Sequence, residues 1–204
     1  THLAGDSWRE MSDTHGFQVP DPGVVGNAFV KAAMALLSDP QHLAQRQSEL
    51  VQGFTAIWQN ALQKLNGAEA ASGGAPGAAP APLPMAQPSP DDRRFQDKAW
   101  DDPYFDFLKQ SYLLTSRWLQ ETLPRAPGLD DKTAKKVDFY TRQLTSALSP
   151  SNFVATNPVA LKKSIETKGE NLRKGLENLL HDLERGKGRL AISMTDYSAF
   201  RVGE

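Results

Sequence analysis

Residues 67–90 are the segment that most constrains how this chain can fold. Eighteen of the twenty-four positions are Gly, Ala or Pro, and Glu69 is the only formally charged residue among them. Such a segment cannot bury enough apolar surface to order itself, and spaced prolines favour a semi-extended tether. We therefore expect three parts: an amino-terminal arm with an amphipathic helix at 1–66, a flexible linker at 67–90, and a helical domain at 91–204.

Two helices are predicted upstream of the linker. The first runs from Val24 to Leu37, and the second starts at Pro40 and reaches about residue 66, because Pro is favoured at the first position of a helix. Apolar residues recur along the second helix at spacings of three, four and seven, and they include Leu43, Leu50, Phe54, Ile57, Trp58, Ala61, Leu62 and Leu65. This stripe is either part of an intramolecular core or a surface that binds a partner or apolar material, and both interpretations stay open.

Further helices are predicted downstream, between prolines and glycines that break them. One opens at Pro103, and a second runs from Asp130 to about Leu148; the short connection between them favours antiparallel packing. A third starts at Asn157-Pro158, and Gly169 separates it from a fourth that ends at Gly186. In the fourth helix we expect five leucines to be buried, namely Leu172, Leu176, Leu179, Leu180 and Leu183.

After Gly188 the pattern changes to alternation of apolar and polar residues, which predicts a half-buried strand or an extended arm. The expected fold class is therefore mainly α: a small helical domain with a flexible amino-terminal arm and a short extended carboxy-terminal segment. No apolar run approaches the roughly 20 residues that span a bilayer, so we expect no transmembrane segment.

The composition argues against a complete catalytic site. The chain has no cysteine and a formal net charge of -1, which excludes a Cys nucleophile and makes nucleic acid an unexpected partner. No phosphate-binding loop, dinucleotide glycine pattern or nucleophile-elbow motif occurs, and the four histidines lie far apart, so we expect no cofactor and no metal. Paired acids at 91–92, 101–102 and 130–131 each precede a predicted helix, where capping is the favoured interpretation.

Arg93 and Arg94 are flanked by acids, which favours an ion-pair network. Contact with an anion or a thioester ligand is the alternative for this pair.

Several short motifs in order resemble the amino-terminal region of class I polyhydroxyalkanoate synthases. They are DRRF at 92–95, AW at 99–100, PYF at 103–105, LSPSNF at 148–153, ATNP at 155–158, GENL at 169–172 and DLERGK at 182–187. The resemblance covers residues 91–204 well. The segment FTAIWQ at 54–59 is similar to the leading helix of that family, while residues 1–40 and the linker match only loosely.

The resemblance implies a parent acyltransferase that polymerises 3-hydroxyacyl-coenzyme A thioesters in a carboxy-terminal α/β-hydrolase domain beyond Glu204. It implies a non-catalytic role for this chain, so no catalytic residue is carried over. Implied partners are its own catalytic domain, a second synthase subunit, granule-associated proteins of the phasin or activator kind, and the polyester granule surface in the cytoplasm.

Two groups of residues are predicted to carry these roles. Partner or granule binding is assigned to Leu50, Phe54, Ile57, Trp58, Ala61 and Leu65. A structural or interdomain role is assigned to Arg93, Arg94, Phe95, Trp100, Pro103 and Tyr104. A free-standing phasin-like granule-coating protein and a self-sufficient acyl-transfer enzyme remain the alternatives.

Overall fold

The computed structural model describes residues 21–70 and 86–186, with side chains described to residue 66 in the first range. Six α-helices occur there: α2 (Pro22–Leu37), α3 (Pro40–Ala70), α4 (Pro103–Thr122), α5 (Asp131–Ala147), α6 (Pro158–Glu166) and α7 (Glu170–Arg185). Three short 3-10 helices, η1 (Arg93–Phe95), η2 (Lys98–Asp101) and η3 (Pro150–Asn152), lie between them. The prediction of a mainly α fold is confirmed, because these ranges contain no strand.

Two predicted segments fall outside the described ranges. The extended segment after Gly188 is one, and most of the amino-terminal arm before α2 is the other. The predicted linker lies partly outside them too, and α3 continues to Ala70, about four residues beyond its predicted end.

Three of the helices, η1, α4 and α5, begin at an aspartate whose side chain accepts a hydrogen bond from a free amide of the first turn. The Asp92 carboxylate accepts from the Arg94 amide at 3.1 Å, and Asp102 accepts from the Tyr104 amide at 3.0 Å. Asp130 accepts from the amide of Thr133 at 2.9 Å. One aspartate of each of the three predicted acidic pairs therefore caps a helix, as predicted. Its negative charge also interacts favourably with the positive end of the helix dipole.

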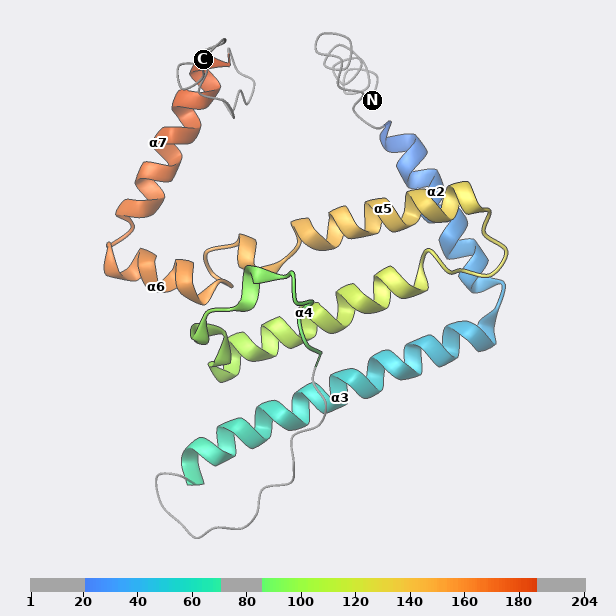
Figure 1. Ribbon diagram of the computed structural model, residues 1–204, viewed down its shortest axis with the longest axis horizontal. Coiled ribbons are helices and arrows are strands. Elements are labelled where there is room, and N and C mark those ends of the chain that lie inside the picture. The colour runs from blue at the N-terminus through green and yellow to red at the C-terminus, as the bar shows by residue number, and fades with distance from the viewer. Residues whose placement is uncertain (1–20, 71–85, 187–204) are drawn as a thin grey trace, which may run out of the picture. The chain divides into compact units, whose positions relative to one another are not determined.

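The chain divides into two compact units, residues 1–152 and 153–204, which are described separately. In the first unit α3 and α4 lie side by side, α5 runs antiparallel to α4, and α2 packs against α5 (Figure 1). The antiparallel arrangement of the helices opened by Pro103 and Asp130 is confirmed.

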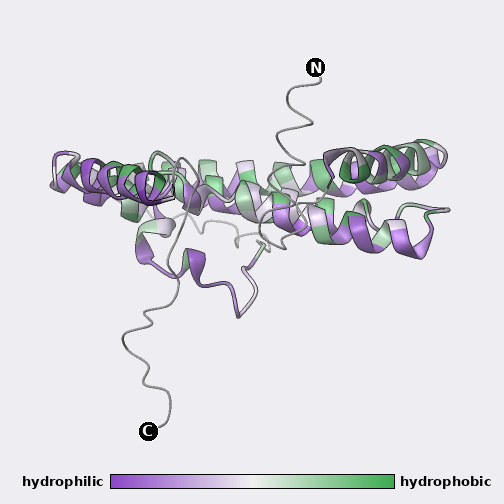
Figure 2. Cartoon of the chain, turned by 90° about the horizontal axis from the view of Figure 1, so that it is seen from above, coloured by the Kyte–Doolittle hydropathy of each residue, from purple (hydrophilic) through white to green (hydrophobic). Residues whose placement is uncertain are grey.

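Two small hydrophobic clusters hold the first unit together. The first joins α2 to α5 through Ala28, Ala32 and Val137, of which Ala32 and Val137 are fully buried. The second is formed by Phe95, Trp100 and Leu113, and it fixes η1 and η2 against α4. Figure 2 shows hydrophobic and hydrophilic residues interspersed along the helices, as expected of helices that bury one face.

Gly53 marks the closest approach of α3 to α4. A Cβ atom at this position would lie 2.7 Å from a methyl carbon of Leu114, a distance too short for two carbon atoms. The absence of a side chain therefore lets α3 pack closely on α4, and the helix tolerates the conformational cost of an internal glycine.

In the second unit, a turn at Lys168 and Gly169 separates α6 from α7. Gly169 has φ +83°, a left-handed conformation that glycine adopts without steric cost. The Asn171 side-chain Nδ2 donates to the Ser164 hydroxyl at 3.0 Å, and the Thr167 hydroxyl donates to Asn171 Oδ1 at 2.9 Å. These side-chain hydrogen bonds tie the start of α7 back to α6.

Candidate interaction surfaces

The predicted partner-binding residues of α3 occupy two different environments. Ile57 is only 4% exposed, while Leu50, Phe54 and Ala61 are half-buried. Trp58 and Leu65 are 57% and 53% exposed. The residues of this face therefore do not form one continuous exposed surface.

Helix α4 packs along α3, and Ile57 of α3 is buried. The ring of Trp58 lies 5.1 Å from that of Phe107, centroid to centroid, and the Trp118 indole N–H donates to the Arg46 carbonyl oxygen at 2.7 Å. Spacing along the sequence could not settle this point, because an amphipathic helix has the same pattern whether its cover is in the chain or in a partner.

An exposed apolar row remains on α3, and we call it the outer α3 stripe. Its members are between 51% and 64% exposed and are Val51, Trp58, Leu62 and Leu65. Their spacings of seven, four and three residues place them along one side of the helix. Two of the four, Trp58 and Leu65, are among the predicted binding residues.

The residues predicted to be structural or interdomain differ in burial. Trp100 is 1% exposed and Phe95 is 8% exposed, and their rings meet edge to face with centroids 4.8 Å apart. Pro103 occupies the first turn of α4. Arg93 is exposed, and Tyr104 is 59% exposed. The two buried aromatic residues belong to the core of the first unit, so a direct interdomain contact is left to the exposed ones.

Arg94 forms the ion pair that the sequence predicted. Its Nε and Nη2 atoms each donate to a different oxygen of Asp92 at 2.8 Å, and Nη1 donates to the Tyr112 hydroxyl at 2.9 Å. The hydrogen bond from Arg94 lowers the pKa of Asp92, and the same contact raises the pKa of the Arg94 guanidinium. Each charge in the pair stabilises the other, and the guanidinium lies over the rings of Phe95 and Tyr112.

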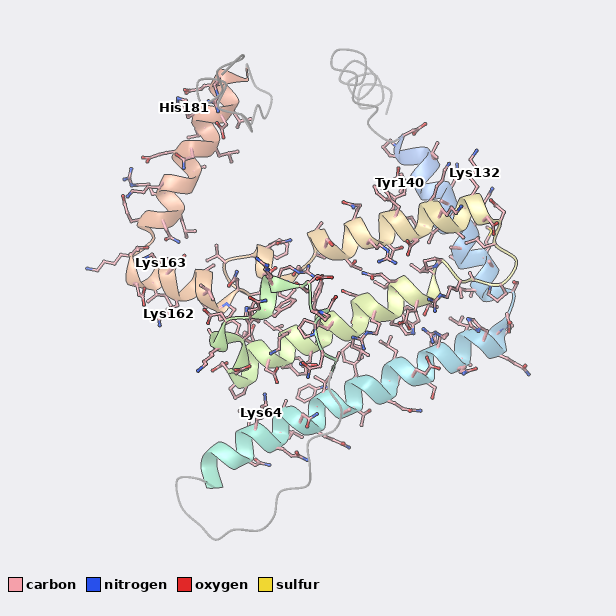
Figure 3. All side chains as sticks on the ribbon, viewed as in Figure 1. Lys64, Lys132, Tyr140, Lys162, Lys163 and His181 are labelled. Carbon is pink, nitrogen blue, oxygen red and sulfur yellow. The ribbon has the colours of Figure 1, made fainter. Side chains whose placement is uncertain are left out.

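A second charge network, which the sequence did not indicate, joins α3 to α4. Asp106 is 6% exposed and accepts from Lys64 Nζ at 2.5 Å and from Lys109 Nζ at 3.0 Å. Lys109, itself 8% exposed, also donates to the Trp100 carbonyl oxygen at 3.2 Å. Burial alone raises the pKa of Asp106, but the hydrogen bonds from Lys64 and Lys109 outweigh it and lower the pKa overall. Figure 3 labels Lys64 near the carboxyl-terminal end of α3.

Helix α7 has an exposed leucine face, and the expectation that its leucines are buried is wrong for the described part of the chain. Leu172, Leu176, Leu179 and Leu180 are 42–56% exposed, and no residue of α7 is buried. The pattern correctly predicted an amphipathic helix, but a pattern does not say what covers the apolar face. We call these four residues the α7 leucine face.

Neither a metal site nor a membrane-spanning helix occurs in the described ranges. No group of three or more His, Cys, Asp or Glu side chains is placed to hold a metal ion among the described residues. Within the same ranges, no helix is both long and apolar enough to cross a bilayer.

Comparisons with known proteins place residues 91–204 under one family model, described as the N-terminus of poly-beta-hydroxybutyrate polymerase (PhaC). A poly(3-hydroxyalkanoate) polymerase from Methylorubrum extorquens is 42% identical over 86% of this chain and 27% of its own length. The polymerase subunit PhaC of Rhizobium meliloti is 36% identical over 98% of this chain and 32% of its own length.

The PhaC subunit of Cupriavidus necator is 40% identical over 89% of this chain and 26% of its own length. The chain thus spans about a quarter to a third of the length of these relatives. No solved structure matches it.

Proposed function

Because the chain belongs to the family of poly-beta-hydroxybutyrate polymerase N-termini, we propose that it is the non-catalytic amino-terminal part of a polyhydroxyalkanoate synthase. In this role it supports polyester synthesis from 3-hydroxyacyl-coenzyme A without contributing a reacting group. It stabilises the catalytic domain and its dimer, helps attach the enzyme to the polymer granule in the cytoplasm, and binds granule-associated proteins.

The observation that carries this proposal is the uncovered α7 leucine face. Four leucines on a 16-residue helix are 42–56% exposed, and the described part of the chain buries none of them. Soluble proteins rarely leave a contiguous apolar patch of this kind in water unless it binds something. A second protein surface is the natural cover for a row of leucines, because a helix can lay such a row into an apolar groove.

We assign the two exposed faces to different partners. The α7 leucine face contacts the catalytic domain or a second synthase subunit, since a row of leucines on a helix fits an apolar groove of another protein surface. The outer α3 stripe contacts the granule or its proteins. This stripe carries an exposed Trp at position 58, and an amphipathic helix with exposed aromatic and leucine side chains can lie on an apolar surface.

Polymer binding is tested with the full chain and particles of amorphous poly(3-hydroxybutyrate) in a sedimentation assay. The triple variant Trp58→Gln, Leu62→Gln, Leu65→Gln removes most of the outer α3 stripe. Its matched control is Val30→Gln, Met34→Gln, Leu37→Gln on α2, which removes three large apolar side chains that are also 51–68% exposed.

We expect the α3 variant to lose at least about tenfold in bound fraction, since each large apolar side chain contributes on the order of 1 kcal/mol or more when buried. The α2 variant keeps its binding, and both keep their helicity by circular dichroism. Equal losses in the two variants would refute the assignment of the granule contact to α3.

The role of α7 is tested in a full-length synthase that contains this segment. Replacing Leu172, Leu176 and Leu180 by Gln should shift the mass measured by light scattering toward the monomer or lower the temperature at which the catalytic domain unfolds. A variant with unchanged mass, unfolding temperature and turnover would refute the proposed contact of α7.

A further inference from the structure

A pocket in the first unit is lined by an unusual number of guanidinium groups. It has a volume of about 400 Å³ and lies between α4, α5 and the segment before η1. Four arginines and two acids line it, and they are Arg94, Arg117, Arg125, Arg142, Asp92 and Glu121. A pocket of this size accommodates a small molecule.

The charges around the pocket do not balance locally. Asp92 is held by Arg94, and Glu121 accepts from Arg46 at 3.2 Å, so both lining carboxylates are already paired. Arg142 pairs with Asp138 through its Nε atom. The remaining two arginines, at 117 and 125, have no carboxylate partner among residues 21–70 and 86–186.

These two arginines are available to a ligand. Arg117 donates one hydrogen bond, from Nη2 to the Gln87 carbonyl oxygen at 3.1 Å, which leaves most of its donors unused. Arg125 is exposed, and the described part of the chain provides no hydrogen-bond acceptor or acid for it. A guanidinium group presents paired N–H donors that match the oxygens of a phosphate group.

A hydroxyl group in the same pocket points to the same ligand chemistry. Ser116 is 9% exposed, lines the pocket, and makes no hydrogen bond to any described residue. A hydroxyl that lines a pocket and has no protein partner can donate to a ligand there. An anion oxygen in the pocket would be a suitable acceptor for it.

We propose that this pocket binds the phosphate group of a phosphorylated ligand. Arg117 and Arg125 form the charged contacts, and Ser116 donates a hydrogen bond to a phosphate oxygen. Arg94 is held by Asp92 and Tyr112 and therefore shapes the wall of the pocket. The proposal stands on the lining residues alone and holds whether or not the chain attaches to a polymer granule.

The test is a calorimetric titration of the full chain at about 50 mM salt, where exposed charges are only weakly screened. Inorganic pyrophosphate and coenzyme A are the soluble probes. Vesicles of phosphatidylcholine with and without phosphatidylglycerol form a separate arm, which distinguishes a lipid phosphate from a free one.

The decisive variant is Arg117→Gln with Arg125→Gln. Its matched control is Lys132→Gln with Lys135→Gln, which removes two exposed positive charges from α5 outside the pocket; Figure 3 labels Lys132 near the start of that helix. A third variant, Ser116→Ala, removes the hydroxyl without changing the charge.

We expect saturable binding of at least one phosphate probe at one site per chain. The arginine variant should weaken it at least about tenfold, the serine variant about threefold, and the lysine control less than about twofold. Saturable binding to the anionic vesicles alone, with the same loss in the arginine variant, would identify the source of the phosphate as lipid. Absence of saturable binding in both arms, or an equal loss in the lysine control, would overturn the proposal.

Discussion

Replacing Asp106 by Ala should destabilise the first unit far more than replacing Lys64 by Ala. The carboxylate of Asp106 and the ammonium of Lys109 both belong to side chains that are about 90% buried, and they lie 3.0 Å apart. Without Asp106, the Lys109 charge keeps only the Trp100 carbonyl oxygen and Asp101, which is 3.7 Å away and 75% exposed. The variant therefore leaves a buried charge without a close counterion.

The expected magnitude follows from that burial. Removing one partner of a buried ion pair costs about 3–5 kcal/mol, and we take about 3 kcal/mol because Asp101 still lies near the ammonium. Lys64 is 42% exposed, so its pair with Asp106 is screened by water and contributes at most about 1 kcal/mol. In a chain of this length, 3 kcal/mol corresponds to a melting temperature lower by about 6–12 °C.

Urea denaturation followed by circular dichroism measures both variants against the unmodified chain. A further variant, Asp106→Leu with Lys109→Met, removes both buried charges and keeps side chains of similar size, so it should cost only about 1 kcal/mol, mainly for the lost hydrogen bond to Trp100. Equal destabilisation by Asp106→Ala and Lys64→Ala, or a larger loss in the double variant than in Asp106→Ala, would refute this reasoning.

Three other substitutions test the rest of the first unit. Trp100→Ala should destabilise it by about 3–5 kcal/mol, because the ring is 1% exposed and its removal leaves a cavity, and a urea midpoint unchanged from that of the unmodified chain would contradict this. Gly53→Ala should cost about 1–3 kcal/mol, measured in the same way, since its Cβ would lie 2.7 Å from Leu114 and push α3 away from α4; a stabilised variant would show that the contact relaxes freely. The hydrogen bond from Arg94 lowers the pKa of Asp92. The ionised Asp92 carboxylate therefore stabilises the fold fully above about pH 5, and this stabilisation is lost as the pH falls through the lowered pKa. The difference in urea midpoint between the unmodified chain and Asp92→Asn should accordingly shrink below about pH 4, and a difference that grows toward low pH would contradict the sign.

The local features of this fold could be predicted from the sequence because they depend on a few neighbouring residues. Asp102 precedes Pro103 at the start of α4, and Asp130 precedes α5. An acidic cap followed by a helix can be recognised from about four consecutive residues of sequence. The break between α6 and α7 at Gly169 could be predicted for the same reason, because the left-handed backbone conformation that ends a helix favours glycine.

Contacts between distant residues could not be predicted in this way. Lys64 and Asp106 are 42 positions apart, and nothing in either segment identifies the other as its partner. The same limit applies to the apolar faces. Ile57 and Leu176 both lie on amphipathic helices with similar spacing, yet one is 4% and the other 56% exposed, because the described residues cover only the first.

The bare α7 leucine face has a consequence for how occupancy of this surface can be observed. Helix α7 has 16 residues, no side-chain cap and no buried residue, so packing within its own unit stabilises it little. Isolated helices of this length are only marginally stable in water. Anything that covers the leucines binds only the helical form, so binding and helix formation are thermodynamically linked. The protection of the α7 backbone amides from hydrogen exchange therefore measures the fraction of molecules in which the α7 leucine face is bound.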